Sequence, residues 1–379
     1  METQFSLFDL LILIGITQGV ITGILLLNSK KNRRSNTFLA LALFSFCLLN
    51  TKTLLHTLHL WDTNTFRFFP NGLELALPPL FYFYLKSLVN PKFSFKIKDW
   101  LHFIPFSLSQ IYAFVVYFSV LGTTNFNEKD AIAASLRFND MKQLDEYLLL
   151  ISIGFYLFYG YKEVRNYKKW LDNTTSDSTF PDFRWLRDIF RLSILIGVFL
   201  LINHSLDIFF HLKNTSILHW NLLTLYITFL IYYLGLKGYL QPDYTFSRTE
   251  IPVTNISPSN TSNIKLSETV AQLQKIMTED KAFLNPKLNI YELSNMIGIS
   301  QKNLSSVINQ HFKMNFRDFV NKYRLEEVKS KLDDSNYKNM SILGIALECG
   351  FNSEASFYRI FKKATGVSPK KFIQHRKGK

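Results

Sequence analysis

Residues Leu288–Phe312, LNIYELSNMIGISQKNLSSVINQHF, contain a pattern of two short helices joined by a tight turn. Asn289 and Glu292 are spaced so that their side chains can satisfy backbone donors of a first helical turn. Gly298 has the backbone freedom that a tight turn needs, and Ser300 can cap a second helix that starts directly after it. The spacing therefore predicts a helix-turn-helix unit.

The same pattern recurs in Ser341–Phe372, SILGIALECGFNSEASFYRIFKKATGVSPKKF. The second copy has one inserted residue between Gly350 and Phe357. Two copies within about fifty residues are a much more specific signal than one helix-turn-helix pattern alone. We therefore predict two related units. The matched positions are Ile290 and Ile342, Leu293 and Ile345, Gly298 and Gly350, Leu304 and Phe357, Ile308 and Phe361, Phe316 and Pro369, and Phe319 and Phe372.

The second predicted helix of the first copy has two different faces. Its apolar positions share one face that can pack, and the opposite face is free to touch a partner. Between the copies, residues 315–334 form a further helical stripe that can act as a rigid strut. The packing face holds Leu304, Val307, Ile308 and His311, the free face holds Lys302, Ser305, Ser306 and Asn309, and the strut stripe holds Phe316, Phe319, Val320 and Tyr323.

Residues 265–377 resemble the DNA-binding domain of the AraC family of bacterial transcription regulators. The stretch from Gly350 to Phe372 matches the most characteristic segment of that family closely. The resemblance implies two recognition helices in successive major grooves, about 34 Å apart on one DNA face. It implies double-stranded promoter DNA and RNA polymerase as partners, with no cofactor.

The resemblance also assigns roles by position. Groove-facing residues would be Lys302, Ser305 and Ser306 in the first unit and Glu354, Ser356 and Arg359 in the second, while Asn309, Lys362 and Lys363 would contact phosphates. These assignments suit the chemistry, because Arg can grip guanine, Glu can accept from cytosine, and basic residues neutralise phosphates.

Two departures from the family pattern concern the turns and the reading surface. Lys313 occupies the position where the second unit has Gly366, so a left-handed turn there would strain the first unit. Ala355 stands where relatives often carry a longer polar side chain. We therefore expect the first unit to be the poorer reader.

Composition separates this basic region from the rest of the 379-residue chain. The net charge is +14, and residues 265–379, with 20 Lys/Arg and 11 Asp/Glu, carry +9 of it, which suits a polyanionic partner. Over the whole chain 47% of residues are hydrophobic and 36 are Phe, which favours a membrane protein. Cys47 and Cys349 lie in different halves, so neither a disulfide framework nor a cysteine metal site is indicated.

The N-terminal part contains apolar runs long enough to cross a bilayer as helices. We predict seven spans, the third of them kinked by Pro78 and Pro79. The predicted fold is all-α: a polytopic bundle in residues 1–240, a polar linker in 241–264, and a double helix-turn-helix domain in 265–379. The predicted spans are 8–27, 37–58, 69–86, 100–121, 146–162, 192–211 and 218–236.

The distribution of Lys and Arg among the loops predicts the orientation. With the N-terminus outside, cytoplasmic loops hold sixteen Lys/Arg and the opposite loops hold five. The C-terminal domain is therefore expected in the cytoplasm and the chain in the bacterial inner membrane. A signal peptide is disfavoured for the first run, because its positive cluster follows the apolar stretch instead of preceding it.

Three classes of function compete. The leading one is a membrane-integral, one-component transcription regulator; the second is a transporter or channel with an autoregulatory DNA-binding domain, which internal repeats would favour. The third is a membrane enzyme, for which no HExxH, GxSxG, Walker A or paired-cysteine motif occurs. His56 and His59 have ligand-like spacing, but their place at a membrane border favours simple solvation.

Ionisable residues are rare inside membrane spans and point to function or to interhelical contacts. Five of them fall in the outer half of the predicted bundle: Lys52, His56, Glu74, His204 and Asp207. Their spacing allows either interhelical polar contacts or an outward-facing pocket for a small polar or charged signal molecule. In the second case, we expect occupancy of the pocket to shift the spans and thereby the DNA-binding units, with homodimerisation as one route.

Overall fold

A computed structural model describes residues 5–90, 93–176, 183–212, 217–241 and 263–377. Those residues are all-α, and their single β feature is an isolated antiparallel bridge between Thr175 and Asn289. The chain divides into two compact units, residues 1–164 with 184–249, and residues 165–183 with 250–379. The predicted linker 241–264 lies outside the described residues except at its ends, and the predicted domain limits stay predictions.

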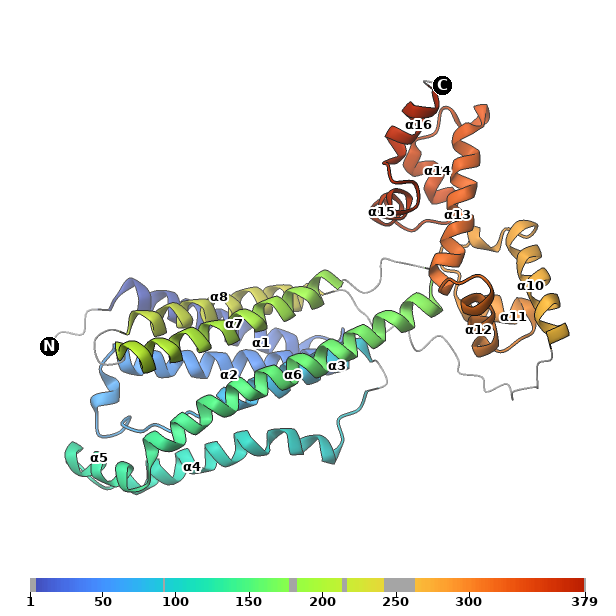
Figure 1. Cartoon of the computed structure of the whole chain (residues 1–379). Coiled ribbons are helices and arrows are strands. Elements are labelled where there is room, and N and C mark those ends of the chain that lie inside the picture. The colour runs from blue at the N-terminus through green and yellow to red at the C-terminus, as the bar shows by residue number, and fades with distance from the viewer. Residues whose placement is uncertain (1–4, 91–92, 177–182, 213–216, 242–262, 378–379) are drawn as a thin grey trace. The chain divides into compact units, whose positions relative to one another are not determined.

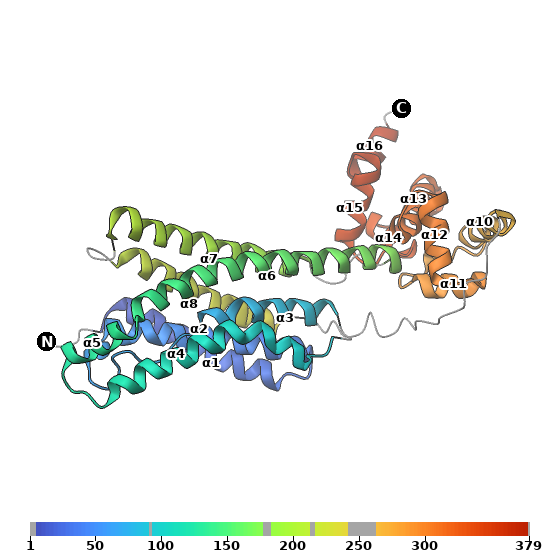
Figure 2. The same ribbon diagram turned by 60° about the horizontal axis from the view of Figure 1, so that its bottom comes forward.

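The N-terminal compact unit is a bundle of long helices that lie side by side (Figures 1 and 2). Each of the seven predicted spans overlaps a helix, but the predicted span 69–86 is α-helical only from Leu77. Its elements are α1 (Leu7–Asn28), α2 (Arg33–Thr57), η1 (Leu60–Asp62), η2 (Glu74–Ala76), α3 (Leu77–Val89), η3 (Ile97–Phe103), α4 (Ile104–Leu121), α5 (Phe126–Ser135), the first part of α6 (Phe138–Thr174), α7 (Phe183–Phe210) and α8 (Leu218–Tyr239).

Five helical segments among the described residues are long and apolar enough to cross a membrane: α1, α2, η3 with α4, α7 from Trp185, and α8. The predicted third span is represented by the 13-residue helix α3. The expected kink was wrong, because Pro78 and Pro79 lie in the first turn of α3, where a missing N–H breaks no helical hydrogen bond.

Small residues let the N-terminal helix approach its neighbours closely. Gly15, Gly19 and Gly23 recur every fourth residue of α1, and side chains such as Thr228 of α8 and Phe44 of α2 occupy the space that a Cβ would need. Close approach through small residues is a common way for helices to pack in a bilayer. This stripe therefore fixes α1 against both α2 and α8.

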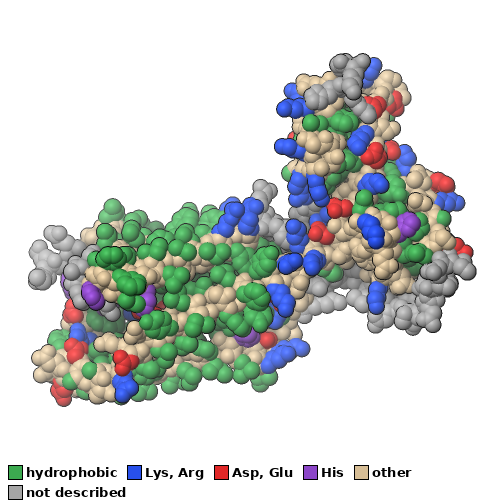
Figure 3. Space-filling model, in the orientation of Figure 1, with side chains coloured by type: hydrophobic (Ala, Val, Ile, Leu, Met, Phe, Trp, Pro, Cys, Tyr) green, Lys and Arg blue, Asp and Glu red, His purple; other side chains and the backbone are tan. Residues whose placement is uncertain are grey.

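The outer surface of the bundle is apolar. Figure 3 shows hydrophobic side chains along the long sides of the bundle and charged side chains toward its ends. Leu108, Phe118, Ile151 and Ile194 are among the many large hydrophobic residues left exposed. Such an extended apolar surface exceeds what a water-soluble monomer usually presents, and it fits a lipid environment.

The C-terminal compact unit has two cores that share one helix. Phe316, Phe319 and Val320 of α13 pack into the first core, and Leu325 and Val328 of the same helix pack into the second. The predicted strut is confirmed in this respect (Figures 1 and 2). The elements are α10 (Asn263–Thr278), η5 (Ala282–Leu284), α11 (Ile290–Ile297), α12 (Gln301–His311), α13 (Phe316–Asp333), η6 (Ser335–Tyr337), α14 (Ile342–Glu348), α15 (Glu354–Thr365) and α16 (Pro369–Lys377).

Candidate nucleic-acid interface and bundle cavity

The first helix-turn-helix unit consists of α11 and α12, and local hydrogen bonds determine the conformation of its turn. Below, "first unit" and "second unit" refer to the two helix-turn-helix units. Asn289 Oδ1 accepts from the backbone N–H of Glu292 at 3.0 Å, and the Ser300 hydroxyl accepts from that of Asn303 at 3.2 Å. Gly298 has φ 75°, in the left-handed region. Both predicted caps form, but the Glu292 carboxylate accepts from Asn285 instead of completing the capping box.

The second unit, α14 and α15, repeats this construction. Ser341 and Ser353 cap its helices through their side chains, and Gly350 has φ 89°. A Cβ on Gly350 would lie 2.5 Å from the carbonyl oxygen of Phe283 and 2.9 Å from Arg324 Nε. Glycine is therefore required here both by the backbone conformation and by the space available.

The packing faces of α12 and α15 match as predicted, except that His311, which was expected on the packing face of α12, is exposed. Leu304 and Phe357 are fully buried, and so are Ile308 and Phe361. These pairs hold the two helices against α13 at corresponding positions. Burial also keeps the thiol of the neighbouring Cys349 protonated, because it raises the pKa of that thiol to about 11.

The opposite faces carry most of the predicted DNA contacts. On α12, Lys302 and Asn309 are exposed, whereas Ser305 and Ser306 are half-buried. The Asn309 amide also donates to the Ser305 hydroxyl at 3.2 Å. On α15, the side chains that project into solvent are Glu354, Ala355, Arg359, Lys362 and Lys363.

Ser356 does not belong to this exposed group. It is 7% exposed, and its hydroxyl is buried without a hydrogen-bond partner in the structure. Because Ser356 lies four residues before Ile360, which packs on the second core, it falls on the edge of the packing face. The assignment of Ser356 as a groove-facing residue is therefore corrected, and the neighbouring Ala355 holds the exposed position.

The turn that follows each of these helices differs between the units. Lys313 has φ 55° and Gly366 has φ 77°, so both turns are left-handed. A lysine in that region is strained where a glycine is not. The predicted strain in the first unit is confirmed.

A buried guanidinium holds the segment 282–288 against α13. Arg324 of α13 is 1% exposed and donates from Nε to the carbonyl of Phe283 at 2.8 Å, and from Nη2 to that of Asn285 at 2.7 Å. Asn352, from the second unit, donates to the carbonyl of Pro286 at 2.9 Å. The short segment 282–288 thus contacts α13 and the second unit just before the first unit begins.

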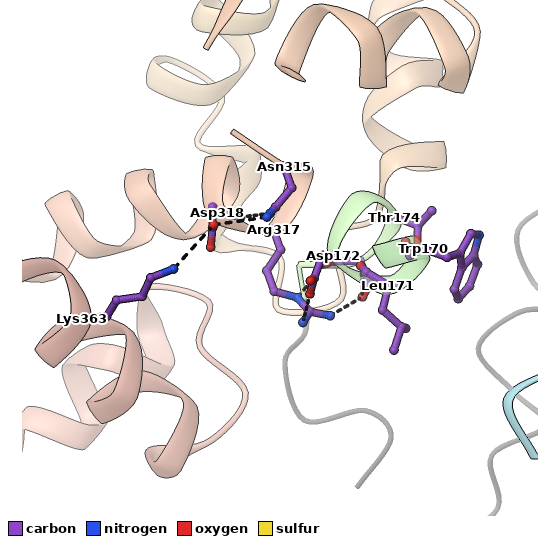
Figure 4. A network of polar contacts seen from close by, with 9 residues as sticks. Trp170, Leu171, Asp172, Thr174, Asn315, Arg317, Asp318 and Lys363 are labelled. Atoms are coloured by element: carbon purple, nitrogen blue, oxygen red, sulfur yellow. Dashed lines mark hydrogen bonds and ion pairs between the residues drawn. The ribbon is translucent and has the colours of Figure 1, made fainter. Parts of the chain in front are cut away.

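The last turn of α6 binds the same region (Figure 4). Asp172 pairs with Arg317 Nη1 at 2.7 Å, and Ser176 donates its backbone N–H to the carbonyl of Leu288 at 3.2 Å. The Ser176 hydroxyl also donates to that carbonyl at 2.6 Å and accepts from Arg324 at 3.1 Å. We call Asp172, Thr175 and Ser176 the α6 clasp.

Sequence reasoning did not find the clasp. Its polar residues resemble an ordinary solvated helix end, and their partners lie more than a hundred residues away. A second cross-helix pair lies nearby, because Lys363 of α15 is 3.8 Å from Asp318 of α13 (Figure 4). Both of these side chains are well exposed, so this pair is weak and Lys363 can turn to a phosphate.

The five ionisable residues predicted in the outer half of the bundle come together. Lys52, His56, Glu74, His204 and Asp207 all line one cavity of about 1030 Å³ in the N-terminal bundle. These five residues come from α2, η2 and α7, and α6 and α8 add further polar lining groups. The prediction that they form a ligand site remains a prediction.

His56 and His59 make separate contacts in the structure. The ring of His56 stacks on Trp61 with centroids 4.4 Å apart, and His59 points to Asp62 at 4.0 Å. Within the described residues, no three His, Cys, Asp or Glu side chains lie close enough together to hold a metal ion.

Comparison with known proteins supports the interpretation of the C-terminal region as a helix-turn-helix domain. The profile of a family described as "Helix-turn-helix domain" matches residues 293–375. Two uncharacterized HTH-type transcriptional regulators of Staphylococcus aureus, from strains MSSA476 and MW2, are 33% identical over 108 residues, which is 26% of this chain and 14% of each relative. No solved structure matches the chain.

A shorter relative is covered for most of its length. The probable transcription factor PqrA of Proteus vulgaris is 38% identical over 91 residues, which is 24% of this chain and 72% of that protein. By contrast, the chain spans about 14% of the length of the staphylococcal relatives. Together with the two helix-turn-helix units described above, these similarities show that the chain belongs to the AraC-type helix-turn-helix family of transcription regulators.

Proposed function

We propose that this protein is a membrane-integral transcription regulator, in which the helical bundle controls sequence-specific DNA binding by the C-terminal unit. One observation carries the proposal. Two helix-turn-helix units share helix α13 in a chain whose described residues also include five helical segments long and apolar enough to cross a membrane. In this proposal the DNA must come to the membrane.

The exposed faces of α12 and α15 divide the work of DNA binding. Arg359 and Glu354 project from α15 and have the chemistry to read base edges. Lys362 and Lys363 neutralise phosphates beside the groove, which makes binding salt-dependent but indifferent to sequence. In the first unit, Lys302 is the principal exposed side chain of this kind, so the second unit carries most of the base preference.

The orientation follows from the loop charges. We place the N-terminus outside and the C-terminal domain in the cytoplasm of a bacterium, with the bundle in the inner membrane. RNA polymerase is the partner that a regulator of this family would act on, and homodimerisation is one way in which the bundle could pair two DNA-binding units.

Helix α6 is the element that we propose transmits control. It begins in the bundle, where Glu146 and Ile153 line the cavity, and its last turn forms the clasp on α13 and segment 282–288. In this proposal a change in the first part of α6 alters the contacts made by its end. Loss or re-formation of the clasp would then change how firmly the first unit is held.

The transporter alternative is less well supported by the cavity. Its charged residues gather at one end, and its other end is lined by Leu85, Ile189 and Phe190. A solute pathway needs polar groups through the whole depth of the bilayer. Reception of a signal molecule fits this arrangement better than transport.

Two assays on the full chain test the proposal. Selection of sites from a random DNA library by protein in lipid nanodiscs should yield a two-part motif with half-sites about one helical turn apart. Alkaline phosphatase fused after Lys379 should be inactive. A phosphatase fused at the N-terminal end, and supplied with an export segment of its own, should be active. Failure to enrich any motif, or an active C-terminal fusion, would reject the proposal.

A further inference from the structure

The cavity of the bundle has a charged end and an apolar end. The charged end is lined by Lys52, Glu74, Glu146 and His204, and deeper positions on α6 such as Leu157 are apolar. Glu146 and Leu157 are eleven residues apart on one helix, which corresponds to roughly 16 Å along its axis. The cavity is therefore long as well as polar at one end.

Close helix contact narrows the apolar end. A Cβ on Gly160 of α6 would lie 3.3 Å from Leu85 of α3 and 3.4 Å from Phe190 of α7. Leu85 and Phe190 themselves line the cavity. Packed side chains of Leu85 and Phe190 therefore close the end of the cavity beyond Ile153 and Leu157. This end suits an apolar chain better than a polar solute.

The charged end contains groups of both signs that the protein satisfies poorly. Lys52 Nζ lies 3.9 Å from Glu74, which is an ion pair but too long for a hydrogen bond. Glu146 is 3.3 Å from His204 Nδ1, and His204 Nε2 is buried without a hydrogen-bond partner in the structure. His204 Nε2 is thus a buried polar atom that favours an additional partner, and the half-buried Lys52 and Glu74 and the exposed Glu146 remain accessible from the cavity.

Asp207 differs from these four residues. Its carboxylate contacts His219 Nε2 at 3.0 Å and accepts from Trp220 Nε1 at 2.9 Å, so α7 and α8 satisfy it internally. Asp207 therefore fits a structural contact between helices. Arg67 and Lys142 also line the cavity, but Arg67 is paired with Asp130 at 2.6 Å and Lys142 lies 3.7 Å from Asp145. The charged groups best placed for a ligand are therefore Lys52, Glu74, Glu146 and His204.

We propose that this cavity binds an amphiphile with a zwitterionic head group and an alkyl tail. A head with both charges can pair its cation with Glu74 or Glu146 and its anion with Lys52 or His204. A head of one sign could pair with only one set of these charges, whereas a head with both charges complements both sets. The tail would lie along α6 beside Ile153 and Leu157. The inference rests on the proposed receptor role of the bundle.

Thermal unfolding of the full chain in neutral maltoside micelles tests the ligand class. The probes are dodecylphosphocholine, dodecanoate, dodecyltrimethylammonium, and phosphocholine as a head group without a tail. We expect saturable stabilisation of about 5 °C by dodecylphosphocholine and smaller shifts with the other three. A two-chain phosphatidylcholine added in parallel distinguishes a bilayer lipid from a free single-chain amphiphile as the source.

Substitutions on one helix supply the matched control. Ile153→Trp fills the tail site, whereas Ile151→Trp places the same side chain at a position that is 69% exposed. Ile153→Trp should abolish the shift, and Ile151→Trp should keep it. If Ile153→Trp does not fold, Glu74→Gln provides a second test, because it should raise the half-saturating concentration by about tenfold.

Three results would overturn the inference. Equal stabilisation by the zwitterionic, anionic and cationic probes would mean that only the tail is recognised. An equal shift with phosphocholine alone would indicate a small polar ligand, and no shift with any probe would leave the charged residues as contacts between helices. Because no DNA takes part, each of these results would leave the proposed DNA-binding function untouched.

Discussion

Where α12 ends, the chain turns through Lys313, whereas the matching turn after α15 passes through Gly366. The two units also differ on their free faces, because α15 exposes Arg359 and two lysines while the serines of α12 are half-buried. The first unit, in turn, is preceded by Leu288, which binds the α6 clasp. The comparison supports our proposal that the second helix-turn-helix unit does most of the DNA reading, while the first unit is also attached to the end of α6.

The largest effect should come from the turn glycines at matching positions. Gly350→Ala meets the carbonyl of Phe283 and needs a positive φ, so we expect a loss of about 3 kcal/mol or more in the unfolding free energy of residues 263–379. Gly298→Ala has open space and should cost about 1 kcal/mol through backbone strain alone. Thermal denaturation of both variants measures the difference.

Cys349 provides a local readout for the same pair. Its pKa of about 11 keeps the folded thiol protonated, so the thiol should react slowly with iodoacetamide at pH 8. Unfolding restores the ordinary pKa, so the unfolded chain loses that proton at lower pH, and the contribution of this group to stability falls as pH rises above about 9. Rapid alkylation in Gly350→Ala and slow alkylation in Gly298→Ala would support the contrast, and equal rates would remove it.

DNA contacts should show the next largest difference. Arg359→Ala should weaken specific binding by about 1–3 kcal/mol and relax base preference, if Arg359 reads a base edge. Lys302→Ala in the first unit should cost less. Lys363→Ala is the matched control, because loss of a phosphate contact should weaken all sequences alike and reduce the salt dependence. Equal losses of specificity in both units would contradict the division of labour.

Weakening the α6 clasp should have a smaller effect on stability. This effect should be confined to the contacts next to the first helix-turn-helix unit. Asp172→Asn removes the charged partner of Arg317 and should cost about 1 kcal/mol, because both side chains are partly exposed. Hydrogen exchange in the full chain should then speed up at the Ser176 amide, which donates to Leu288. Faster exchange at Gly350 instead would place the link on the second unit.

The smallest effect concerns the strained turn. Lys313→Gly should stabilise the first unit by about 0.5–1 kcal/mol because glycine tolerates the left-handed backbone. The reverse exchange, Gly366→Lys, should destabilise the second unit by a similar amount, since nothing lies within 4 Å of a Cβ placed there. Chemical denaturation of residues 263–379 would detect both changes, and opposite signs are required.

Local patterns predicted the features that depend on neighbouring residues. The caps at Asn289 and Ser300, the turns at Gly298 and Gly350, and the stripe on α13 follow from helix period and backbone chemistry. The clustering of Lys52, Glu74 and His204 around one cavity follows from their common depth in the predicted spans.

The features that sequence reasoning missed depend on long-range packing. Asp172 and Ser176 meet partners distant in sequence, and no periodic pattern marks such contacts. Arg324 reads as a surface residue, yet it is buried because backbone carbonyls and Ser176 satisfy its donors. Ser356 was placed on the free face by position alone, and only the packing of Ile360 shows that its side of α15 is covered.

The most direct measurement is the mapping of DNA that is crosslinked in cells to the full chain recovered from the membrane fraction. We predict enrichment of promoter fragments that share a two-part motif, with the enrichment lost in Arg359→Ala while the protein stays in that fraction. Recovery of the chain from the soluble fraction, or membrane-bound protein with no enriched sequence, would contradict the claim that a membrane-integral bundle controls a DNA reader.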